Sequence, residues 1–83
     1  MESIGERIRN VRKKKNLTIT QLKEITGLSA GNLSDIENSK ISPSSNALIK
    51  LKNALGVSID WILTGKYFNN STDSIKEMLL IKI

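Results

Sequence analysis

The chain has 83 residues, enough for one small domain with a modest core. It contains no cysteine and no histidine, which excludes disulfides, thiolate chemistry, the usual zinc ligands and the commonest general base. We therefore expect a binding protein that is not an enzyme and that carries no metal and no cofactor.

The charge of the chain favours a polyanionic partner, since 13 Lys and Arg residues outnumber 8 Asp and Glu residues. The excess is concentrated in residues 1–16, which hold six of the basic residues. No apolar run approaches the ~20 residues that cross a membrane, and no apolar leader opens the chain. We expect a cytoplasmic protein without a membrane partner.

A first helix is predicted over about residues 3–15, because Ile4, Ile8 and Val11 recur on one helical face. Two short helices follow, over about residues 19–38. Their pattern is that of a helix-turn-helix: Thr18 starts the first helix in a capping box, and Gly27 ends it with a left-handed backbone. The outer face of the second helix is then free to enter the major groove of DNA.

Serines and glycines mark the ends of two more helices. The first begins at Ser44 or Ser45, after a loop with the only proline, and ends at Gly56. The second begins at Ser58 and ends at Gly65. Its apolar residues are Ile59, Ile62 and Leu63, with Trp61 beside them. Helices without an alternating strand pattern predict an all-α fold.

Residues 1–65 are thus the predicted domain, and residues 66–83 a linker with a short C-terminal helix. The apolar residues of this tail favour burial against a second subunit or against the body of the domain; a truncated longer protein is a third interpretation. The candidates for dimerisation are Ile75, Met78, Leu79 and Ile81.

One combination of residues is more specific than any single motif. It comprises Arg7, Ile8, Arg9, Val11, Arg12, Leu17, Thr18, Leu22, Gly27, Leu28, Ser29, Leu33, Ser34, Ile36, Glu37, Asn38, Pro43, Ser44 and residues 55–65. In this combination residues 4–65 resemble the Cro/cI-repressor type of helix-turn-helix domain, also called the XRE family of bacterial and phage transcriptional regulators. The resemblance implies a five-helix, lambda-repressor-like domain that binds operator DNA as a homodimer and usually represses transcription. It also implies an ion pair between Arg12 and Glu37, with Arg12 facing a phosphate.

The exposed face of the predicted recognition helix carries few large side chains. Asn32, Ser34 and Asp35 can hydrogen-bond to base edges, and Ala30 can contact a thymine methyl group. The resemblance places Ala30, Gly31 and Asp35 where bases are most often touched. Because Gly31 costs a helix roughly 1 kcal/mol relative to Ala, we interpret it as allowing close approach to DNA.

Phosphate contacts are expected at two places. The N-terminus of the helix-turn-helix offers backbone N–H groups together with Thr18, Thr20 and Gln21, and the end of the recognition helix offers Asn38 and Lys40. Double-stranded DNA is therefore the predicted partner. The alternative is a protein-interaction module with the same fold, such as an antitoxin or an antirepressor-binding component, because the base-reading face is poor and the tail is apolar.

Overall fold

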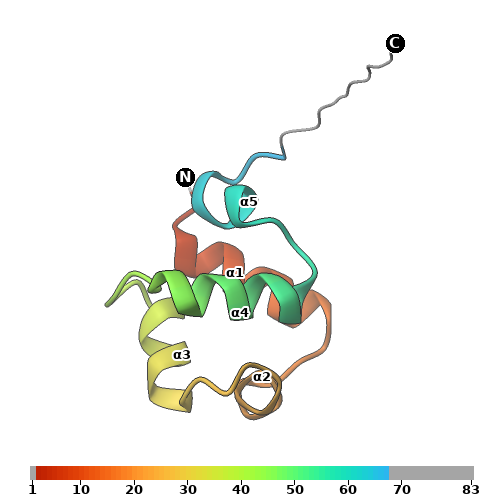
Figure 1. Cartoon of the computed structure of the whole chain (residues 1–83), viewed down its shortest axis with the longest axis vertical. Helices are drawn as coiled ribbons and strands as arrows, with labels where there is room; N and C mark the ends of the chain where they lie inside the picture. The colour runs from red at the N-terminus through yellow and green to blue at the C-terminus, as the bar shows by residue number, and fades with distance from the viewer. Residues whose placement is uncertain (1, 68–83) are drawn as a thin grey trace.

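Five α-helices make up residues 2–67, the part of the chain that the computed structural model describes. They are α1 (Ile4–Lys14), α2 (Ile19–Thr26), α3 (Ala30–Glu37), α4 (Ser45–Leu55) and α5 (Ile59–Thr64). Figure 1 shows α1 and α4 across the middle of the molecule, with α2 and α3 at one end and α5 at the other. The predicted all-α, five-helix architecture is confirmed. The predicted C-terminal helix and the dimerisation candidates lie outside the described residues.

Hydroxyl side chains fix where each helix begins. Before every helix a serine or threonine oxygen accepts the backbone N–H three residues further on; these residues are Ser3, Thr18, Ser29, Ser44 and Ser58. At Thr18 the predicted capping box with Gln21 is present. A second capping box joins Ser3 to Glu6, and the hydrogen bonds from Ser3 lower the pKa of the Glu6 carboxyl. Local sequence therefore sets the helix boundaries almost by itself.

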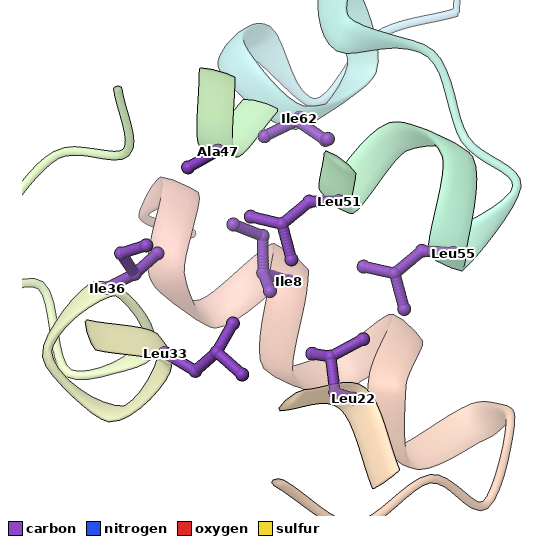
Figure 2. Close-up of a cluster of buried hydrophobic side chains, with 8 residues drawn as sticks. All are labelled: Ile8, Leu22, Leu33, Ile36, Ala47, Leu51, Leu55 and Ile62. Carbon is purple, nitrogen blue, oxygen red and sulfur yellow. The ribbon is translucent and has the colours of Figure 1, made fainter. Parts of the chain in front are cut away.

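All five helices contribute to one hydrophobic core (Figure 2). Its buried residues are Ile8, Leu22, Leu33, Ile36, Ala47, Leu51, Leu55 and Ile62. Of the apolar residues of α5, Ile62 is buried, whereas 44% of the surface of Leu63 is exposed. In a helix of six residues Ile62 occupies the inner face, and Leu63 is turned about 100° away from it.

A close approach of α1 to α3 depends on Gly5, which sequence reasoning did not single out. Gly5 is buried in the first turn of α1, against the last backbone carbonyls of α3. A Cβ atom there would overlap the carbonyl oxygen of Ile36 and lie 2.6 Å from that of Glu37. Only a residue without a side chain lets the two backbones come this close.

We predict that Gly5→Ala lowers the free energy of unfolding by about 2 kcal/mol or more, because the obstacle is backbone that cannot rotate away. Gly31→Ala is the matched control. Gly31 also holds the second position of its helix, but nothing lies within 4 Å of a Cβ placed there. The control should be stabilised by about 0.5 kcal/mol. Chemical denaturation measures both, and equal effects of the two substitutions would contradict the close approach.

Candidate nucleic-acid interface

The helix-turn-helix, α2 with α3, lies at the end of the molecule opposite α5 (Figure 1). The inner side of α3 buries Leu33, Ile36 and Glu37 against the rest of the domain. Of the predicted base-reading residues, Ala30, Gly31 and Ser34 are exposed, whereas Asn32 and Asp35 are half-buried. The outer face of α3 is therefore nearly flat, because its exposed residues have small side chains.

A buried ion pair joins α1 to the end of α3. The Glu37 side chain is only 3% exposed, and both of its carboxylate oxygens accept hydrogen bonds from Arg12. Arg12 Nε lies 2.6 Å from Glu37 Oε2, and Arg12 Nη2 lies 2.9 Å from Glu37 Oε1. These hydrogen bonds raise the pKa of Arg12 above its ordinary value. The geometry is that of the ion pair that the family resemblance implied.

Arg12 is poorly accessible to a phosphate, because most of its side chain is buried and three of its five N–H groups are already bonded within the domain. Its side chain is 11% exposed, and its Nη1 donates to the backbone oxygen of Leu17 at 2.8 Å. Arg9, which the sequence analysis did not select, is the more accessible of the two arginines. Its side chain is 36% exposed, and its Nε lies 3.4 Å from Glu37 Oε1. The carboxylate of Glu37 is thus shared by two guanidinium groups from successive turns of α1.

The other predicted phosphate ligands all lie on the surface. Thr18, Thr20 and Gln21 are exposed at the N-terminus of α2, and Asn38 and Lys40 are exposed directly after α3. The Thr18 oxygen and the Gln21 side-chain oxygen both accept backbone N–H groups in the capping box. Within residues 2–67 the Thr18 hydroxyl and the Gln21 amino group donate no hydrogen bond of their own, so these donors stay available to a ligand.

Arg7 counts toward the basic excess of α1 but belongs to the domain interior. It is 7% exposed, and its guanidinium donates to the backbone oxygens of Ile62, Leu63 and Glu2. Two of these carbonyls lie in the last turn of α5, where a helix leaves its acceptors unsatisfied. The sequence feature that could have indicated its burial is its position three residues after Ile4 and four before Val11, within the apolar stripe of α1.

Among residues 2–67 no cluster of acidic, histidine or cysteine side chains could hold a metal ion. Within the same residues no helix is long and apolar enough to cross a membrane.

Comparison with protein families decides the assignment. The family described as "Helix-turn-helix domain" matches residues 5–68. The chain belongs to this family. The resemblance to Cro/cI-type regulators is thereby confirmed, and a family of this kind also confirms that the chain is not an enzyme.

Individual proteins resemble the chain in sequence and in structure. The immunity repressor protein of Bacillus phage phi105 is 38% identical over 61 residues, which cover 74% of this chain and 42% of the phage protein. The chain thus spans less than half the length of that relative. The P22 c2 repressor, solved with a synthetic operator, superposes with a TM-score of 0.76 at 35% identity, covering 80% of this chain and 100% of the repressor chain. SinR, the biofilm regulator of Bacillus subtilis, solved with DNA, gives 0.68 at 35% identity over 71% of this chain and 95% of its own.

We predict that Glu37→Ala lowers the free energy of unfolding by about 3 kcal/mol, because Arg12 is left as a nearly buried charge without its partner. Glu24→Ala is the control: Glu24 is an exposed carboxylate on α2, so its removal should change stability by less than about 0.5 kcal/mol. Urea denaturation of both variants provides the measurement. A Glu37→Ala protein as stable as the control would mean that the ion pair contributes nothing to the fold.

Proposed function

We propose that the chain is a sequence-specific DNA-binding transcriptional repressor of a bacterium or a phage, acting in the cytoplasm. The observation that carries the proposal is the exposed outer face of α3 beside the exposed start of α2, with α3 fixed from behind by the buried Arg12–Glu37 pair. An α-helix presented in this way fits the major groove of B-DNA. The P22 c2 repressor and SinR, both solved with DNA, support the assignment.

In this proposal five residues of α3 face the base pairs: Ala30, Gly31, Asn32, Ser34 and Asp35. Asn32, Ser34 and Asp35 supply hydrogen bonds, and Ala30 supplies a methyl contact with thymine. The open space around Gly31 supports a different role for that residue. Without a side chain there, the backbone of α3 can lie closer to the base edges, so part of the specificity comes from groove shape and bridging water.

Phosphates on either side of the groove are contacted by Thr18, Thr20 and Gln21 at the start of α2, and by Asn38 and Lys40 after α3. Their exposure supports this assignment. Arg12 acts chiefly by holding Glu37, and contributes to phosphate binding through its charge rather than by a direct hydrogen bond.

The proposed repressor binds an inverted-repeat operator as a homodimer, since one domain places only one helix in one groove segment. Ile75, Met78, Leu79 and Ile81 remain the proposed dimer contact. Exposed apolar groups at the end of α5 offer a second one: Leu63 is 44% exposed, and Tyr67, 64% exposed, stacks on Trp61 with ring centroids 5.7 Å apart. Partner proteins such as an antirepressor or a toxin would compete for this apolar surface.

Selection of bound sites from random duplex DNA tests the proposal. We predict an enriched inverted repeat with half-sites about one helical turn apart. With roughly four phosphates neutralised per subunit, the logarithm of affinity should fall with the logarithm of salt concentration with a slope of about −7.

Failure of the selection to enrich any sequence, together with a slope near zero, would contradict DNA binding and favour the protein-interaction alternative.

The dimer contact is located by a chain shortened to residues 1–71, which keeps all five helices of the described residues. Loss of affinity for the full inverted repeat would support a dimer contact within residues 72–83. Unchanged affinity would favour a dimer contact at the end of α5.

A further inference from the structure

Three side chains form a chain of hydrogen bonds from α1 to the outer face of α3. Arg9 Nη2 donates to Asn38 Oδ1, and Asn38 Nδ2 donates to Ser34 Oγ at 3.4 Å. Arg9 is itself fixed at this place, because its Nε also lies 3.4 Å from the buried carboxylate of Glu37. Ser34 is exposed on the surface of α3. A residue of α1 is thus connected through Asn38 to an exposed residue on the outer face of α3.

The direction of these hydrogen bonds follows from chemistry. A guanidinium group has only donors, so Asn38 must present its side-chain oxygen to Arg9. The amino group of Asn38 then points to the other side, toward Ser34. With the amide reversed, two donors would face each other at the arginine. Arg9 therefore determines the orientation of the Asn38 amide.

The hydroxyl of Ser34 is in consequence an acceptor toward Asn38, and its own proton is left to donate elsewhere. The hydroxyls of Thr26 and Thr64 donate to the backbone oxygen four residues earlier, at 2.7 Å in both cases. Within residues 2–67 the Ser34 hydroxyl makes no such hydrogen bond and accepts only from Asn38. Its donor is therefore free for a group outside the domain.

We propose that Arg9 is a positioning residue which, through Asn38, fixes Ser34 as a hydrogen-bond donor toward a base edge. The inference rests on the proposed DNA-binding function and refines it. A freely rotating serine hydroxyl can pair with a donor or an acceptor. When one of its two lone pairs accepts from Asn38, its proton is left to donate outside the domain, which favours an acceptor as the partner. In the major groove guanine, adenine and thymine each present an acceptor, but cytosine presents only its amino donor. Ser34 thus discriminates against cytosine at one position of the half-site.

The test is competition binding with the selected operator and with variants that place each base in turn at every half-site position. The wild-type chain should disfavour cytosine at one position by about three- to ten-fold, the range expected for one neutral hydrogen bond. Ser34→Ala and Arg9→Met should both abolish this preference at the same position. Arg9→Lys should retain it, because an ammonium group also only donates.

Lys14→Met is the matched control, since Lys14 is another exposed cation of α1. It should leave the base preference unchanged, whatever its effect on overall affinity. Asn38→Ala interrupts the same chain without touching Glu37, so it replaces Arg9→Met if that variant fails to fold. Its expected result is the same loss of preference.

Two outcomes would overturn the inference while leaving the proposed function intact. In the first, Arg9→Met weakens binding to every sequence alike and keeps the discrimination against cytosine, which would make Arg9 a phosphate ligand. In the second, Ser34→Ala leaves the base preference unchanged. If the wild-type chain selects no sequence at all, the proposed function fails first and this inference fails with it.

Discussion

A single buried carboxylate determines how the recognition helix is presented. Glu37, in the last turn of α3, receives hydrogen bonds from Arg12 and Arg9 of α1 and is almost completely withdrawn from solvent. A buried charge destabilises a fold unless a charge of opposite sign pairs with it in good geometry. The bidentate hydrogen bonds from the Arg12 guanidinium to Glu37 supply that geometry. Any rotation of α3 relative to α1 would break these contacts. The outer face of α3 is therefore fixed by an interaction on its inner side.

The backbone contact at Gly5 makes this arrangement possible. Because α1 begins directly against the last carbonyls of α3, the arginines one and two turns later reach Glu37. Arg7, on the same helix, extends the connection in the opposite direction, to the last turn of α5. Helix α1 thus joins the end of the domain proposed to contact DNA to the end proposed to contact a second subunit.

Local signals predicted most of the fold, because helix ends depend on neighbouring residues. A hydroxyl or glycine stands at nearly every boundary, and the capping box of Thr18 and Gln21 is present as expected. Signals that depend on tertiary packing were harder to interpret. Arg7 and Glu37 both occupy positions of an apolar helical stripe, and only the carbonyls or guanidinium groups opposite explain their burial.

The sequence also indicated part of the geometry of the candidate site. The resemblance implied the ion pair of Arg12 and Glu37 that the structure contains. Of the five residues expected on the exposed face of α3, three are exposed and two, Asn32 and Asp35, are half-buried. Sequence reasoning could not identify Arg9, because its contacts with Glu37 and Asn38 depend on the crossing of α1 and α3. Nor could it distinguish Arg12, which is almost buried and uses three of its five N–H groups within the domain, from a side chain free to bind phosphate.

A double-mutant cycle on Arg12 and Glu37 tests most directly whether the ion pair holds α3 in place. Arg12→Met, Glu37→Gln and the double variant would be compared with the wild-type chain by chemical denaturation. If the two side chains act as one unit, the double variant loses much less stability than the two single losses added together, with a coupling of more than about 1 kcal/mol. Additive losses, within about 0.5 kcal/mol, would contradict the account, because α3 would then be positioned by the hydrophobic core alone.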